Sequence, residues 1–176
     1  MLYPLTFQPI FQARIWGGRN LETLYRKKLP PGKIGESWEI SDRAEANSIV
    51  SNGPLAGRTL ESLMAENREE LLGRARPSEG RFPLLIKLLD AQDNLSLQVH
   101  PPGHLAREMG GSAKTEMWYV SAAEPDAKLY AGLRRGVTRD EFAEKTTRGS
   151  VAECFHQLPV RAGDSLFLPS GRVHAL

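Results

Sequence analysis

The sequence predicts a mainly β protein of antiparallel strands with a small helical addition. Its 16 glycines and 12 prolines are scattered along 176 residues and separate short apolar stretches, as in all-β folds. Most of these apolar stretches are as long as a typical strand, and such stretches dominate after residue 80. We therefore expect one domain over residues 1–176, a sandwich or barrel, with a helical insertion at residues 55–80.

Two stretches predict helices by their spacing and their end signals. In TLESLMAENREELLGRA the apolar residues recur at roughly helical intervals, with Thr59 as a candidate N-cap and Gly73 near the end. In TRDEFAEKTTRG, Thr138 and Glu141 can form a capping box and Gly149 can end the helix.

The remaining short segments predict strands, because they are apolar or alternating and are bounded by turn residues. In chain order these are ESWEIS, NSIVS, PLLIKLLD, NLSLQVH, EMWYVSA, AKLYAGL, AECFHQLPV, SLFLP and the terminal VHAL. Short turns between consecutive strands favour antiparallel pairing.

Charge and cysteine content exclude several classes of protein. Lysine and arginine number 23 against 21 acidic residues, and a net charge of +2 is too small to indicate a nucleic acid or an anionic membrane as partner. Cys154 stands alone, which rules out an internal disulfide and a thiolate metal site. With neither a signal peptide nor a membrane span apparent, we expect a soluble cytoplasmic protein that acts on a small molecule.

The stretch LSLQVHPPGH carries polar groups on one side of a predicted strand. Alternation places Ser96, Gln98 and His100 on one face and the leucines and Val99 on the other. An ordinary antiparallel strand with one solvated face would show the same pattern.

Three further residues can join this polar face. Lys114 and Glu116 share one side of the strand in KTEMWYV, and His174 follows the turn in GDSLFLPSGRVH. If Gln98, His100, Glu116 and His174 meet, they offer nitrogen and oxygen ligands that suit zinc or another first-row divalent ion. Each of the four could equally have an ordinary surface or turn position. For His104 and His156, surface or core positions are the stronger interpretation.

The segment GDSLFLPSGRVH resembles the second conserved motif of the cupin superfamily, and QVH replaces the usual histidine pair of the first motif. Together with WGGRNL, IGESWEIS, FPLLIKLLDA, LSLQVHP and KTEMWYV, it is similar to the type I mannose-6-phosphate isomerases, particularly their short bacterial form. The similarity runs from about Trp16 to the last residue. It implies a cupin-type jelly roll or antiparallel β-barrel.

The resemblance also implies a ligand set. In that family the glutamine, the first histidine, the glutamate and the second histidine of these motifs hold a zinc ion. By position these residues are Gln98, His100, Glu116 and His174, so one Zn²⁺ per chain is expected.

Other motif residues acquire roles by the same resemblance. Lys114 matches an active-site lysine and is the candidate catalytic residue, while Ser96 matches a serine near the sugar phosphate. Trp16 and Glu36 match positions at the pocket wall. Lys87 is a weaker substrate-binding candidate, because a lysine extending from a mostly buried strand would look the same.

The implied reaction interconverts mannose 6-phosphate and fructose 6-phosphate through an enediol. Family members continue past the motif PSGRVHAL into further strands and an arginine-bearing segment, so we expect these C-terminal strands to be missing from this chain. Zinc binding is therefore a firmer expectation than turnover. The alternatives are a non-catalytic, metal-binding and sugar-binding cupin, and an iron cupin oxygenase, against which Gln98 argues.

Overall fold

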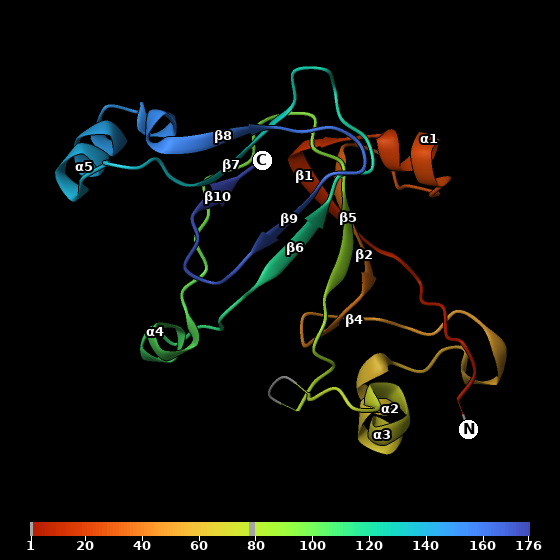
Figure 1. The fold of residues 1–176 in the computed structure, drawn as a ribbon. Helices are drawn as coiled ribbons and strands as arrows, with labels where there is room; N and C mark the ends of the chain where they lie inside the picture. The colour runs from red at the N-terminus through yellow and green to blue at the C-terminus, as the bar shows by residue number, and fades with distance from the viewer. Residues whose placement is uncertain (1, 78–79) are drawn as a thin grey trace. The chain divides into compact units, whose positions relative to one another are not determined.

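The structure is a computed structural model and describes residues 2–77 and 80–176. The chain divides into two compact units, Met1–Asp93 and Asn94–Leu176, here called the N-terminal unit and the C-terminal unit. Figure 1 shows the elements along the chain. The organisation as one domain with an insertion stays a prediction.

The N-terminal unit is built on a three-stranded antiparallel sheet with the order β1-β2-β5 (Figure 1). Its strands are β1 (Ile10–Gly18), β2 (Ile34–Ile40) and β5 (Ile86–Leu89). The central strand β2 is almost entirely buried in its first half. Strands β1 and β5 flank β2, so its residues have neighbours on both sides.

Glycines allow the end of β1 to approach β2 closely. A Cβ atom on Gly17 would lie 2.4 Å from the backbone nitrogen of Gly35, and one on Gly35 would meet Arg14 and Trp16 at 2.6 Å. No side chain fits in such gaps. The register between β1 and β2 shifts in this region, which indicates a bulge.

Short elements complete the N-terminal unit. They are α1 (Asn20–Tyr25), β3 (Asp42–Arg43), β4 (Ala46–Asn47), the 3₁₀ turn η1 (Gly53–Leu55), α2 (Leu60–Glu66) and α3 (Arg68–Leu72). The predicted cap of the first helix is confirmed, because the Thr59 hydroxyl accepts a hydrogen bond from the Ser62 amide at 3.1 Å. Instead of one helix, the segment forms two that meet at Asn67. Buried Leu60, Leu63 and Met64 anchor α2 to the core.

The C-terminal unit contains two antiparallel sheets, one with the order β10-β7-β8 and one pairing β6 with β9. The strands are β6 (Glu116–Tyr119), β7 (Lys128–Leu133), β8 (Phe155–Pro159), β9 (Ser165–Leu168) and β10 (His174–Ala175). The helical elements are α4 (Gly103–Glu108), α5 (Arg139–Thr147) and the 3₁₀ turn η2 (Val151–Cys154). The buried apolar residues of the C-terminal unit include Leu129, Cys154, Phe155 and Leu168.

The mainly β prediction is confirmed, and most predicted strands appear. Within the described residues the strands form separate sheets of two or three strands, so the cupin barrel stays a prediction. At α5 the Thr138 hydroxyl accepts from the Glu141 amide at 3.1 Å, whereas the Glu141 carboxylate pairs with Lys145. None of the helices in the described parts of the chain is long and apolar enough to cross a membrane.

Two segments differ from the strand predictions. The segment NLSLQVH was expected to be a strand with one apolar and one polar face. It forms only an isolated bridge between Gln98 and His174, and Leu97 and Val99 are exposed. Conversely, β1 is absent from the predicted strands. Its sequence IFQARIWGG mixes charged, apolar and glycine residues, and its pairing with β2 holds it in place.

Candidate metal centre

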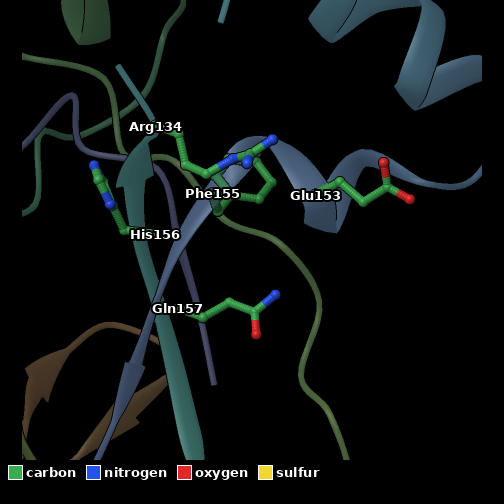
Figure 2. Close-up of a pocket in the computed structure, with 5 residues that line it drawn as sticks. All are labelled: Arg134, Glu153, Phe155, His156 and Gln157. Carbon is green, nitrogen blue, oxygen red and sulfur yellow. The ribbon is translucent and has the colours of Figure 1, made fainter. Parts of the chain in front are cut away.

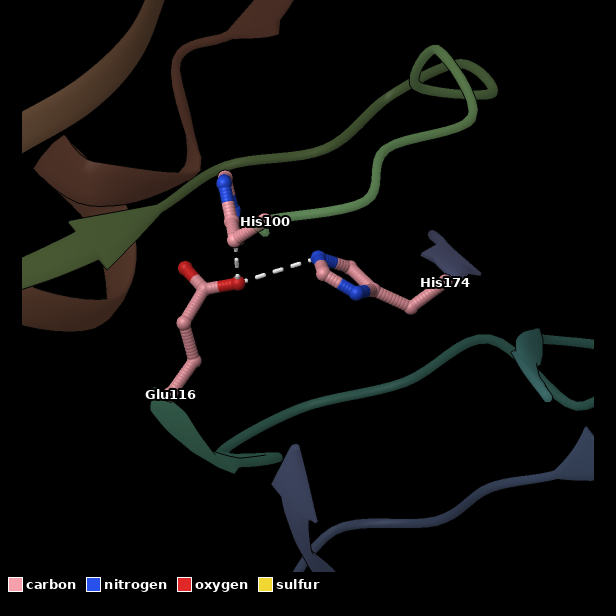
Figure 3. Close-up of side chains that lie close together, drawn as sticks. All are labelled: His100, Glu116 and His174. Atoms are coloured by element: carbon pink, nitrogen blue, oxygen red, sulfur yellow. Dashed lines mark ion pairs between the residues drawn. The ribbon is translucent and has the colours of Figure 1, made fainter. Parts of the chain in front are cut away.

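Three predicted ligands of the C-terminal unit converge on one point. One potential ligand atom from each of His100, Glu116 and His174 lies within 4.8 Å of the other two. The Oε2 atom of Glu116 is 3.3 Å from Nε2 of His100 and 3.0 Å from Nε2 of His174 (Figure 3). Glu116 begins β6 and His174 begins β10, while His100 lies in the segment before α4.

These three atoms are buried and have no hydrogen-bond partner, although both Nε2 atoms lie within 3.3 Å of Oε2 of Glu116. Buried polar atoms are nearly always paired, because an unpaired one loses its interactions with water. Two imidazole nitrogens and a carboxylate oxygen around one point are a donor set that suits zinc and other first-row divalent ions. The residues therefore fit a metal ion.

The hydrogen bonds around the cluster favour ligation by His174. Its Nδ1 lies 2.9 Å from the backbone oxygen of Arg172, so Nδ1–H is the donor in a neutral ring. That tautomer leaves the Nε2 lone pair directed at Glu116, as in metal-bound histidines. The Trp118 ring packs edge-on against His174 with centroids 5.3 Å apart and helps to hold the ring.

Lys114 pairs with one of the two oxygens of the Glu116 carboxylate. Its Nζ lies 2.6 Å from Oε1, which leaves Oε2 for the two histidines. Burial alone would raise the pKa of Glu116, but the hydrogen bond and the charge of Lys114, with the two imidazoles, hold that pKa below its usual value. Burial, followed by the charge of Lys114, lowers the pKa of His100. Both shifts favour the forms that bind a metal.

Backbone hydrogen bonds bring the two histidine segments together. Gln98 and His174 exchange reciprocal N–H···O bonds of 2.8 and 2.9 Å, and the Gly171 amide donates to the His100 carbonyl at 2.6 Å. The predicted ligand Gln98 is thus tied to His174 through its backbone, and it is an exposed residue.

The other predicted site residues divide between the two units. Ser96 is exposed in the C-terminal unit. Trp16 on β1, Glu36 on β2 and Lys87 on β5 belong to the N-terminal unit. There Glu36 is buried, and Lys87 lies 3.5 Å from its carboxylate.

Sequence reasoning missed two neighbours of the cluster. Trp118 is two residues from Glu116, so strand alternation could have placed it on the same face. The Arg172 carbonyl had no sequence signal, since any residue offers one. His104 and His156 are exposed and are not members of the cluster, in line with the interpretation given to them.

A separate hollow of about 400 Å³ lies at the start of β8. It is lined by Arg134, Glu153, Phe155, His156 and Gln157, none of which is a predicted site residue (Figure 2). It is therefore distinct from the cluster around Glu116.

The fold and the cluster together define a mainly β protein with a candidate histidine–carboxylate metal centre. A family profile described as "Phosphomannose isomerase type I, catalytic domain" matches residues 5–131. The chain therefore belongs to the type I phosphomannose isomerase family, which confirms the resemblance seen in its motifs.

Individual relatives agree with this assignment. The chain is 39% identical to the probable mannose-6-phosphate isomerase GmuF of Bacillus subtilis, over 100% of this chain and 55% of that protein. It is 38% identical to mannose-6-phosphate isomerase of Streptococcus mutans, again over 100% of the chain and 55% of the relative. The chain thus spans about half the length of the curated relatives it matches.

Solved structures give the same result. The mannose 6-phosphate isomerase of Bacillus subtilis superposes with a TM-score of 0.88 at 34% identity, covering 98% of this chain and 55% of that one. A putative mannosephosphate isomerase from Archaeoglobus fulgidus has a TM-score of 0.77 at 27% identity, covering 98% and 58%.

Proposed function

We propose that this chain carries the metal centre of a zinc-dependent aldose–ketose isomerase of the cytoplasm that interconverts mannose 6-phosphate and fructose 6-phosphate through an enediol. The observation that carries the proposal is the group of three buried, unpaired donor atoms on His100, Glu116 and His174. The family of the chain and the names of its relatives supply the substrate class.

The metal would be held by Gln98, His100, Glu116 and His174, one ion per chain. Zinc with a single carboxylate ligand retains net positive charge and stabilises negative charge that develops on nearby oxygens. The hydrogen bond to the Arg172 carbonyl orients the His174 ring, and the contact with Lys114 orients the Glu116 carboxylate. The chain therefore orients its ligands by its own contacts.

Lys114 is the proposed catalytic residue. Its ammonium is held 2.6 Å from Oε1 of Glu116 and is part-buried, so its position is fixed beside the candidate centre. A positioned ammonium can donate a hydrogen bond to an enediolate oxygen where negative charge develops. Ser96, Trp16, Glu36 and Lys87 are the proposed substrate-binding residues.

Metal analysis and an isomerase assay test the proposal in turn. Dialysed protein loaded with zinc should retain about one equivalent, and fructose 6-phosphate formation should require that zinc. Protein that retains no zinc would refute the centre. Zinc-loaded protein that binds fructose 6-phosphate without converting it would support the second candidate, a metal-binding and sugar-binding protein without turnover. That candidate is retained because the matched region is 55% of the relatives' length.

A further inference from the structure

The two carboxylate oxygens of Glu116 have different surroundings. Oε2 is buried and has the imidazoles of His100 and His174 beside it, and both dashed lines in Figure 3 end on this oxygen. Oε1 instead lies 2.6 Å from Nζ of Lys114. A carboxylate binds a metal ion through one oxygen or through both. The contacts of Oε1 therefore decide how many ligand atoms Glu116 offers.

The ion pair between Lys114 and Oε1 is close and partly shielded from water. Its N···O distance of 2.6 Å is short, and charge-assisted hydrogen bonds are about twice as strong as neutral ones. The side chains are 29% exposed for Lys114 and 11% exposed for Glu116, so solvent and salt screen the contact less than they would on an open surface. A metal ion that used Oε1 would have to displace the ammonium.

The donor atoms that remain suit some metal ions better than others. Without Oε1, the cluster of three residues offers two imidazole nitrogens and one carboxylate oxygen. Zinc accepts nitrogen ligands at a low coordination number, whereas manganese, calcium and magnesium favour carboxylate, carbonyl and water oxygens. A second oxygen from Glu116 would therefore benefit manganese more than zinc.

We infer that Lys114 is a positioning residue that withholds Oε1 of Glu116 from the metal ion and thereby makes the centre prefer zinc to manganese. This role rests on the metal centre of the proposed function and adds a determinant of metal selectivity to it. It is compatible with the contact proposed between Lys114 and substrate, because an ammonium has three N–H donors and Oε1 uses one of them.

The test compares the dissociation constants of zinc and of manganese(II) for the full chain, each measured against a competing chelator. Loss of a residue that holds a metal ligand costs about 10- to 100-fold in metal affinity. Zinc should show such a loss in Lys114→Met, while manganese should lose little because it gains Oε1. The preference for zinc over manganese should therefore fall by about tenfold or more.

A second lysine–carboxylate pair of the C-terminal unit supplies the matched control. The Lys145 ammonium lies 2.7 Å from the Glu153 carboxylate, and neither residue belongs to the cluster. Lys145→Met should leave the metal preference unchanged. Lys114→Arg keeps a cation that can donate to Oε1, so it should retain most of the preference. Lys114→Ala takes the place of Lys114→Met if the methionine variant does not fold.

The visible absorption of the cobalt(II)-loaded protein is a readout that a merely structural role of Lys114 would not change. Four-coordinate cobalt(II) absorbs visible light much more strongly than six-coordinate cobalt(II), so the intensity reports the number of ligands. The absorption should weaken in Lys114→Met, because Oε1 becomes an additional ligand. It should stay the same in Lys145→Met.

An unchanged ratio of the zinc and manganese dissociation constants in Lys114→Met would overturn the selectivity role and leave the proposed function intact. Equal losses of affinity for both ions, with an unchanged cobalt spectrum, would also overturn it. Unmodified protein that retains no zinc would instead refute the proposed metal centre, and the role of Lys114 in metal selectivity with it.

Discussion

The Nε2 atom of His174 lies 3.0 Å from Oε2 of Glu116, yet neither atom has a hydrogen-bond partner. The other ends of both side chains are engaged, His174 by the Arg172 carbonyl and Glu116 by Lys114. The unengaged ends therefore face a common point with His100. This relationship carries the proposed metal centre and the first predictions.

Substitution of His100 by alanine should lower zinc affinity by more than about a hundredfold, because loss of an outer partner alone costs about 10- to 100-fold. His104→Ala is the control, since His104 is exposed on α4 and outside the cluster. Competition with a chromogenic chelator measures both affinities. Equal losses in the two variants would show that His100 is not a ligand.

Zinc should raise the stability of the folded chain. Because a ligand that binds only the folded state adds about 2.7 kcal/mol at a hundred times its dissociation constant, thermal unfolding should shift upward with added zinc. The shift should disappear with a chelator and in His174→Ala. A zinc-induced shift that persists in His174→Ala would place the ion elsewhere.

Lys114→Met should reduce turnover by about a hundredfold or more while zinc stays bound, as expected for a group that acts mainly in the transition state. A coupled assay for fructose 6-phosphate, run beside metal analysis, measures both properties. Near-normal turnover in the variant would remove Lys114 from the mechanism.

The cap of α2 should contribute more to global stability than the cap of α5. Thr59→Ala removes the bond to the Ser62 amide at the start of a helix that buries Leu60, Leu63 and Met64, so a loss of about 1 kcal/mol is expected. Thr138→Ala removes a similar bond from α5, which buries none of its residues, and should cost less. Denaturant unfolding of the two variants compares them.

The Glu153 carboxyl should titrate below its ordinary range. A hydrogen bond from Lys145 at 2.7 Å, and then the charge of that lysine, lower the pKa of Glu153. The pair therefore stabilises the fold above the unfolded pKa, and this contribution is lost as the pH falls through the folded pKa. Lys145→Met should raise the Glu153 pKa in an NMR titration, whereas Arg148→Met should leave it unchanged.

Local signals predicted much of the secondary structure. The caps at Thr59 and Thr138 appear where they were expected, because a cap depends on residues only three apart. The strand expected over NLSLQVH does not form, because a strand depends on distant residues and not on near neighbours in the sequence. A strand needs partners along its length, and this segment has one bridge, to His174.

For the site, the order of residues along the chain was enough to predict which residue types are available and which of them share a face. Period-two alternation linked Lys114 to Glu116, and family motifs pointed to His100 and His174. Those inferences use positions two apart or motif spacing, and both are visible without a fold.

Tertiary structure decided which of these groups meet and what holds them. His100, Glu116 and His174 come from segments as far apart as residues 100 and 174. Long-range strand pairing brings them into one cluster. The same holds for Glu36, whose partners Arg14 and Lys87 come from flanking strands more than 20 residues away. The energy of a buried charge depends on these distant neighbours, so only the folded chain fixes it.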